Sequence, residues 1–436
     1  MTVHVERTSQ YIHNLRNRIP FRYGIAEMTA VPHLFLKVEC EIDGESVYGV
    51  AADSLIPKWF TKDPKTSYRE DVGDMLQVIE RACQLAQGLG KVETVFGGWQ
   101  QIYAEQQSWA SKQGYPPLLW NFGVSLVERA VIDAFCRAKG LSFNQALRRN
   151  AFGMRLGELH SELHGKAPRD LLPNQPLRKI HVRHTIGLGD PLSESEISAE
   201  ERIDDGLPHS LEASIRTYGL SYFKVKVSGN LAQDAERLCQ IDGVLQACDV
   251  SHYYFTLDGN EQYESVKQLR VFWEGLRRDS ACAPHLNRLL FVEQPLHRAV
   301  ALNAETQTEL QAWKEKPLMI IDESDALIES LRTALDSGYA GTSHKNCKGV
   351  FKGIANACLL AQRRANDPHG DYVLSGEDLA NIGPVALLQD LAVMASLGIE
   401  HVERNGHHYF AGLSMFPAEL QQQVIQRHAD LYRSQD

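Results

Sequence analysis

The sequence predicts an α/β protein that consists of a TIM-type (β/α) barrel preceded by a smaller α+β domain. Three observations favour this fold class. The chain has 436 residues, which exceeds one average domain but fits a small domain plus a barrel of about 250 residues. From residue 179 onward, short β-rich runs alternate with helical stretches, whereas the part before residue 150 mixes β and helical patterns without that alternation.

Residues 1–153 carry the signals of the α+β domain. The β-rich runs HLFLKVECEI and ESVYGVAA are joined at Asp43 and Gly44, a dipeptide suited to a tight hairpin turn. Between residues 121 and 139, Val124, Val131 and Phe135 recur at helical spacing before Gly140. We therefore expect an antiparallel hairpin followed by helices.

The remaining chain divides into a connection, a barrel and a tail. Residues 154–178 contain three prolines and many charges, which is typical of a connecting segment. Eight βα units across 179–403 would close a barrel, and residues 404–436 would return toward the first domain. The eight candidate strands are KIHVRHTI, SYFKVKV, YYFTLD, RLLFVEQ, PLMIID, GTSHK, YVLSG and IEHVE.

Composition excludes several classes of function. The formal net charge is −10 and the pI is near 5.9, so a phosphate-backbone binder is not expected. No run of about 18 apolar residues predicts a membrane span, and the polar N-terminal stretch lacks the apolar core of a secretory signal. Eight scattered cysteines without a C-x-x-C pair favour reduced thiols. These features indicate a cytoplasmic protein.

Polar residues end five successive candidate strands, at the edge where barrel enzymes carry their reactive groups. They are Lys224 and Lys226 on strand two, Asp258 and Asn260 on strand three, Glu293 on strand four, Asp322 and Glu323 on strand five, and His344 and Lys345 on strand six. Strands two and six face each other across an eight-stranded barrel. The order of the strands around the barrel therefore places three carboxylates between two opposed amines.

This arrangement suits one hard cation and a proton transfer. Oxygen ligands alone favour Mg²⁺, and because Asp322 and Glu323 point to opposite sides of their strand, only one of them should be a ligand. A cation with open positions can bind a substrate carboxylate and stabilise an enolate. Like-charge repulsion from Lys224 can lower the pKa of Lys226 enough for it to act as a base.

The segments FKVKV, LDGN, FVEQP, IDES and HKNCKG, in this order, resemble the enolase superfamily of the mandelate racemase and muconate-lactonizing type, closest to the muconate-lactonizing branch. The resemblance covers nearly the whole chain. SLVERAVIDAFCRAKG is similar to the helix that leads from the family's capping domain into its barrel. Members use lysine or histidine bases with Mg²⁺. The resemblance therefore implies a capping domain over a Mg²⁺-dependent barrel.

The resemblance also implies roles for individual residues. Loops 21–24 and 54–59 would close over the site and select the substrate. The implied metal ligands are Asp258, Glu293 and Asp322; the implied acid/base groups are Lys226 and Lys345, assisted by Lys224; and the implied substrate contacts are Arg22, Tyr23, Asn260 and Glu403. Because GTSHK is short and poor in large apolar residues, Lys348 competes with Lys345 for the role on strand six. Strand seven lacks the histidine of the mandelate-racemase arrangement, and strand eight lacks the D-x-D of dipeptide epimerases.

The expected activity is abstraction of the proton beside a carboxylate, with racemisation, epimerisation, cycloisomerisation or dehydration as outcomes. A small-molecule carboxylate would be the partner, without nucleic acid or membrane, and the chain would form a homo-oligomer. Two alternatives stay open at this point. One is an aldolase in which a lysine forms a Schiff base, and the other is a non-catalytic barrel that binds an acid.

Overall fold

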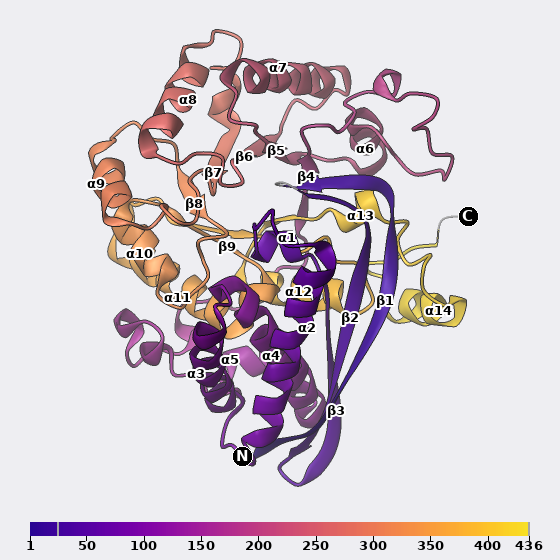
Figure 1. The fold of residues 1–436 in the computed structure, drawn as a ribbon, viewed down its shortest axis with the longest axis vertical. Helices are drawn as coiled ribbons and strands as arrows, with labels where there is room; N and C mark the ends of the chain where they lie inside the picture. The colour runs from indigo at the N-terminus through magenta and orange to yellow at the C-terminus, as the bar shows by residue number, and fades with distance from the viewer. Residues whose placement is uncertain (24–25, 435–436) are drawn as a thin grey trace.

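The computed structural model describes residues 1–23 and 26–434, apart from the side chains of Arg22, Tyr23 and Ala26. It contains a three-stranded antiparallel sheet with helices and a closed eight-stranded barrel. Figure 1 shows the N-terminal unit in indigo and purple against the barrel in pink, orange and yellow. The predicted fold class is confirmed.

The N-terminal sheet has the order β1 (Val3–Tyr23), β2 (Ala26–Ile42), β3 (Glu45–Ser54). The β2–β3 hairpin turns where the sequence predicted it. Ile42 pairs with Glu45, and Asp43 and Gly44 take the positive φ values of 52° and 89° that such a two-residue turn requires.

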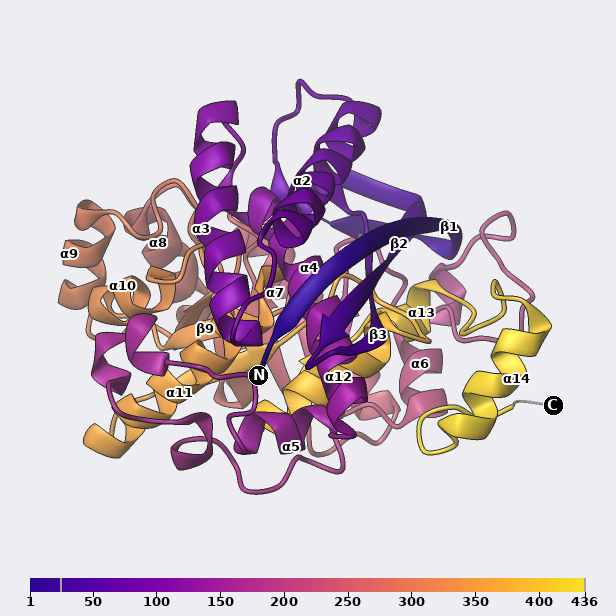
Figure 2. The ribbon, with the colours of Figure 1, turned by 90° about the horizontal axis from the view of Figure 1, so that it is seen from below.

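Helix α4 (Pro117–Lys139) is the central element of the N-terminal unit. It begins at a proline, four residues earlier than the predicted helix, and ends at Gly140 in the left-handed conformation. It packs on β2 and β3, on α2 and α3, and also touches α11 of the barrel. Seen from below, α2 and α3 lie on one side of α4 and α5 on the other (Figure 2). The other helices of this unit are α1 (Pro57–Phe60), α2 (Tyr68–Gly88), α3 (Val95–Gln113) and α5 (Phe143–Arg148).

All eight barrel strands are parallel to their neighbours and closely match the predicted runs. The barrel closes in the order β10-β11-β4-β5-β6-β7-β8-β9. Its strands are β4 (His181–Ile186), β5 (Tyr222–Lys226), β6 (Tyr254–Asp258), β7 (Leu289–Glu293), β8 (Met319–Ile321), β9 (Gly341–His344), β10 (Val373–Gly376) and β11 (His401–Glu403).

The unusual composition of β9 has a steric cause. A Cβ atom at Gly341 would lie 1.8 Å from the carbonyl oxygen of Val373 on β10. Glycine is therefore required at this position, whereas Thr342 and Ser343 use their hydroxyl groups to donate to Asp325 and Asp322 at 3.0 and 2.6 Å.

Helices surround the barrel, and short turns fill the connections. The barrel helices are α6 (Leu211–Tyr218), α7 (Leu231–Ala247), α8 (Val266–Arg278), α9 (Ala304–Ala312), α10 (Ser330–Ser337), α11 (Val350–Asn366) and α12 (Ala386–Leu397). The 3₁₀ turns are η1 (Leu156–Glu158), η2 (Ser161–Leu163), η3 (Pro168–Asp170), η4 (Glu194–Glu196), η5 (His285–Arg288) and η6 (Asn346–Lys348).

After β11 the chain runs back against the N-terminal sheet through α13 (Gly406–Tyr409) and α14 (Ala418–Arg427). The Nε2 atom of His13 on β1 lies 3.0 Å from the carbonyl oxygen of Met415. Arg18 donates to the carbonyl oxygen of His408 at 2.9 Å. Among the helices of the described chain, none has the length and apolar content needed to cross a bilayer.

Candidate active site

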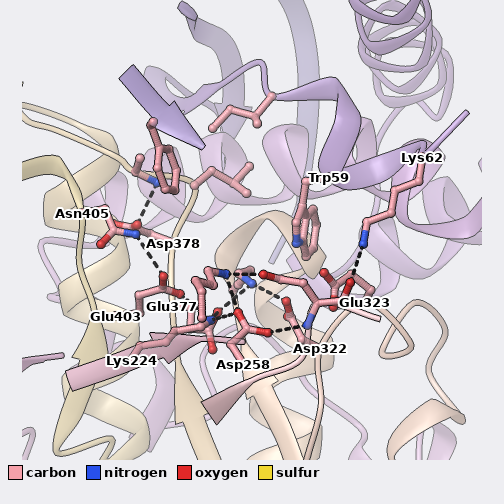
Figure 3. Close-up of a pocket in the computed structure, with 17 residues that line it drawn as sticks. Trp59, Lys62, Lys224, Asp258, Asp322, Glu323, Glu377, Asp378, Glu403 and Asn405 are labelled. Atoms are coloured by element: carbon pink, nitrogen blue, oxygen red, sulfur yellow. Dashed lines mark hydrogen bonds and ion pairs between the residues drawn. The ribbon is translucent and has the colours of Figure 1, made fainter. Parts of the chain in front are cut away.

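A cavity of about 50 Å³ lies at the carboxyl ends of the barrel strands, beneath the segment that contains α1. Figure 3 shows Trp59 and Lys62 of the N-terminal unit above the carboxylates and lysines of the barrel. The lining residues include Lys224, Lys226, Asp258, Asn260, Asp322, Glu323, Lys345, Glu377 and Glu403. Most of the strand-end residues that the sequence singled out therefore meet at this cavity, whereas Glu293 and His344 are not among its lining residues.

Lys224 on β5 lies at the centre of the charged groups. Its Nζ atom is 2.8 Å from Glu293, 2.8 Å from Glu403, 2.9 Å from Asp258 and 3.0 Å from Glu377. Burial alone would lower the pKa of Lys224, but these four carboxylates raise it well above its ordinary value. The four carboxylates around its amine suit a supporting role for Lys224.

Lys226, two residues later on the same strand, faces the cavity. Its Nζ atom donates to Asp258 Oδ2 at 2.5 Å and to Asn260 Oδ1 at 2.7 Å. Asp258 also accepts from the backbone N–H of Asn260 through Oδ1 at 2.9 Å. Asn260, named as a substrate contact, thus helps to hold both Lys226 and Asp258 in place.

Lys345 and Lys348 lie on either side of Asp322. Lys345 Nζ is 2.6 Å from Asp322 Oδ2 and 2.8 Å from Glu377 Oε2, and it lies 4.6 Å from the ring centroid of Trp59. Lys348 Nζ contacts Asp322 Oδ1 at 3.0 Å and the carbonyl oxygen of Ser343 at 2.5 Å. Lys345 lines the cavity, whereas Lys348 is not among its lining residues.

Three buried carboxylates offer oxygens within 4.8 Å of one another, and they are Glu293, Asp322 and Glu377. Glu293 Oε2 has no hydrogen-bond partner among the described residues. Burial and the neighbouring Glu377 raise the pKa of Glu293 well above its usual range. Against the effect of burial, Lys345 and Lys348 hold the pKa of Asp322 well below its usual range. The donor set suits a hard divalent cation, which would relieve the crowding of negative charge.

This group differs in one member from the ligands implied by the sequence. Asp258 is turned toward Lys226 and Lys224, and Glu377 takes a place beside Glu293 and Asp322. Glu377 follows β10 directly, so the rule that selected the other strand ends could have found it. The resemblance gave no metal ligand on strand seven, which is why Glu377 is not among the predicted ligands. Beneath Glu377, the buried Arg183 of β4 lies 3.3 Å from its Oε1 atom.

Glu403 ends β11 and lines the cavity, but both of its oxygens are engaged. Oε2 accepts from Lys224 at 2.8 Å, while Oε1 accepts from Thr185 at 2.5 Å and from Asn405 at 3.0 Å. Lys224 and the neighbouring amines hold the pKa of Glu403 well below its usual range, although burial opposes this. Its predicted part in orienting the substrate stays a prediction.

The N-terminal unit covers the cavity through the segment around α1. Arg298, from the loop after β7, donates to the carbonyl oxygens of Trp59 and Phe60 at 3.1 and 3.0 Å. Lys62 forms an ion pair with Glu261 and donates to the carbonyl oxygen of Asn260 at 3.1 Å. Residues 54–59 thus lie over the site as the resemblance implies. The side chains of Arg22 and Tyr23 lie outside the described residues, as does Gly24.

Comparisons with solved structures agree with this architecture. The chain is similar to the N-succinyl Arg/Lys racemase from Bacillus cereus, with 16% identity, a TM-score of 0.60 and coverage of 94% of this chain and 89% of that one. It is equally similar to the L-Ala-D/L-Glu epimerase from Bacillus subtilis, with 16% identity, a TM-score of 0.59 and coverage of 94% and 91%. The muconate lactonizing enzyme from Pseudomonas fluorescens gives 15% identity, a TM-score of 0.58 and coverage of 94% and 89%.

The chain shares their fold. At such identities the likeness concerns the fold alone, and it extends over nearly the full length of each chain. No protein-family model matches the sequence, and no curated protein matches it. The site geometry has to carry the functional argument.

Proposed function

We propose that the protein is a Mg²⁺-dependent enzyme of the enolase superfamily, of the mandelate racemase and muconate-lactonizing type, that abstracts the proton beside a substrate carboxylate. The observation that carries this proposal is the position of Lys226 and Lys345 on opposite strands, on either side of a buried carboxylate group. Solved structures with this fold include racemases, an epimerase and a muconate lactonizing enzyme, which supports the same reaction class.

Glu293 and Asp322 would hold the metal, together with Asp258 as the resemblance implies or Glu377 as the distances favour. When bound, Mg²⁺ supplies positive charge for the substrate carboxylate and for the enolate that forms from it. The buried position of these acids, at 1–2% exposure for Glu293 and Asp322, excludes water and strengthens that attraction.

Lys226 and Lys345 would perform the proton transfer. One amine, in its neutral form, removes the proton on its side of the substrate, and the protonated amine opposite delivers a proton to the other face. Both steps together give racemisation or epimerisation. If one amine removes the proton and a group then leaves the β-carbon, the result is an elimination. This elimination is a dehydration when the leaving group is water, and it is the reverse of a cycloisomerisation when the leaving group is a carboxylate of the same molecule. Of the two candidates on strand six, Lys345 is favoured because it lines the cavity.

The test measures exchange of solvent deuterium into a library of carboxylic acids in the presence of Mg²⁺. We expect exchange by the wild type, its loss after chelation of the metal, and a loss of at least about 10³-fold in Lys226→Ala and in Lys345→Ala, the upper part of the range for general acid–base groups. Calorimetric titration with Mg²⁺ should show that both variants still bind the metal. Full activity in either variant would refute the assignment.

Trapping with borohydride separates this proposal from the Schiff-base alternative, because only an imine would leave a covalent adduct on a lysine. The proposed partner is a small-molecule carboxylate. The expectations of a cytoplasmic location and of a homo-oligomer stay predictions, as do the domain boundaries at 153, 178 and 403.

A further inference from the structure

Glu323 stands out among the residues that line the cavity because both of its carboxylate oxygens lack a hydrogen-bond partner in the described part of the chain. The residue is 2% exposed, and neither of its carboxylate oxygens has a hydrogen-bond partner among the described residues. In Figure 3 it lies on the side of Lys62, away from Glu403 and Asn405. Buried polar groups in proteins almost always have partners, so such an exception in a cavity wall points to a ligand.

The nearby cations are already engaged. Lys62 is paired with Glu261. Arg298 donates to Glu261 through Nε at 2.7 Å and through Nη2 at 2.9 Å. Glu261 thus takes both cations on this side, and it does not line the cavity. Glu323, which does line the cavity, feels the charge of both cations, but within the described chain it forms no hydrogen bond with either of them.

Glu323 is also separate from the proposed metal group. Its neighbour Asp322 is bound by Lys345 and Lys348 and belongs to the carboxylate group with Glu293 and Glu377. Successive residues at a strand end point in different directions. The carboxylate of Glu323 therefore lines the cavity without belonging to the group formed by Glu293, Asp322 and Glu377.

We propose that Glu323 receives a cationic group at the far end of the substrate, which would make the substrate a carboxylic acid that also carries an ammonium or guanidinium group. This inference rests on the proposed function, because it assumes that the substrate carboxylate lies at the metal group. A charge-assisted hydrogen bond to a buried carboxylate is stronger than a neutral one. A second carboxylate at the far end would be repelled.

The experiment compares straight-chain carboxylic acids of increasing length whose far ends are an ammonium, a hydroxyl, a methyl or a carboxylate group. Dissociation constants are measured by calorimetry with the full-length protein and saturating Mg²⁺. At the best length, the ammonium-ended acid should bind at least about tenfold more tightly than the methyl-ended acid, as expected for a hydrogen bond to a charged group. Glu323→Gln should abolish this preference and leave the binding of the methyl-ended acid unchanged.

Glu264→Gln is the matched control, since it removes an exposed carboxylate from the same loop that neither lines the cavity nor pairs with Lys62 or Arg298, and the ammonium preference should survive. Thermal unfolding supplies a second readout. If Glu323 serves to bind a ligand, Glu323→Gln should unfold at the same temperature as the wild type or at a higher one. The reason is that the substitution replaces a buried carboxylate that lacks a hydrogen-bond partner among the described residues with a neutral amide. A lower unfolding temperature would indicate a structural role and contradict the inference.

Two results would overturn the inference while leaving the proposed function intact. One is tighter binding of the acids that end in a hydroxyl, methyl or carboxylate group. The other is a preference for the ammonium-ended acid that persists in Glu323→Gln. Failure of every acid to bind with Mg²⁺ would instead contradict the proposed function and, with it, this inference.

Discussion

Lys345 and Lys348 are the two residues whose roles the structure separates most clearly. Both are buried and both contact Asp322, but only Lys345 reaches the cavity. Lys348 is held by the backbone carbonyl of Ser343 and by Asp322 itself. Its contacts are those of a residue that fixes the orientation of Asp322, and they leave it no access to a substrate.

We therefore expect Lys348→Met and Lys345→Met to fail in different ways. Lys348→Met should lower the free energy of unfolding by about 3–5 kcal/mol, because it breaks a buried ion pair, and should retain measurable deuterium exchange. Lys345→Met should abolish exchange. Urea unfolding and exchange into the acid library measure both effects. A folded Lys348→Met protein without exchange, beside an active Lys345→Met protein, would reverse the assignment.

At the scale of elements, the crossing of α2 and α4 depends on one glycine. A Cβ atom at Gly123 would lie 2.3 Å from the carbonyl oxygen of Val78. Since α4 also touches η6 and α11, a displacement of α4 would reach the segment that carries Lys345. The close packing of two N-terminal helices is thus coupled to the site in the barrel.

Gly123→Ala should destabilise the protein by about 1–3 kcal/mol, because the added methyl group forces the two helices apart. Gly73→Ala is the matched control. Gly73 lies within α2, and a Cβ atom added there would have nothing within 4 Å of it. It should stabilise the protein by up to about 1 kcal/mol through helix propensity. Urea denaturation measures both changes, and equal effects of the two substitutions would show that the Val78 contact does not decide the crossing.

At the scale of the whole molecule, several histidines are buried in their neutral form. Burial lowers the pKa of His33 to about 3, of His184 to about 4 and of His401 to about 3. Below pH 6.5 the unfolded chain binds protons that these rings in the folded protein do not. Proton binding therefore stabilises the unfolded state, and the free energy of unfolding falls as the pH drops toward 4.

His184→Gln tests this dependence. The shift of the His184 pKa corresponds to about 3 kcal/mol of stability lost between pH 6.5 and 4. The difference in unfolding free energy between wild type and variant should therefore change in that window and stay constant above pH 7. Urea denaturation at a series of pH values measures it. Parallel curves down to pH 4 would show that the folded protein accommodates the charged ring of His184.

The alternation of apolar runs and polar strand ends along the sequence determined the eight-stranded barrel, the hairpin at Asp43 and Gly44, and the set of residues that meet at the cavity. These features depend on local periodicity and on the rule that parallel strands end at one edge. Only the tertiary structure decided three other features. They are the place of Lys224 among four carboxylates, the preference for Lys345 over Lys348, and the lack of hydrogen-bond partners at Glu323 among the described residues. Distances of a few ångströms between residues far apart in the chain set ion pairing and desolvation, and a linear pattern does not contain them. Glu377 lies between the two cases, since its strand-end position was visible in the sequence but its place beside Glu293 and Asp322 followed only from the closed barrel.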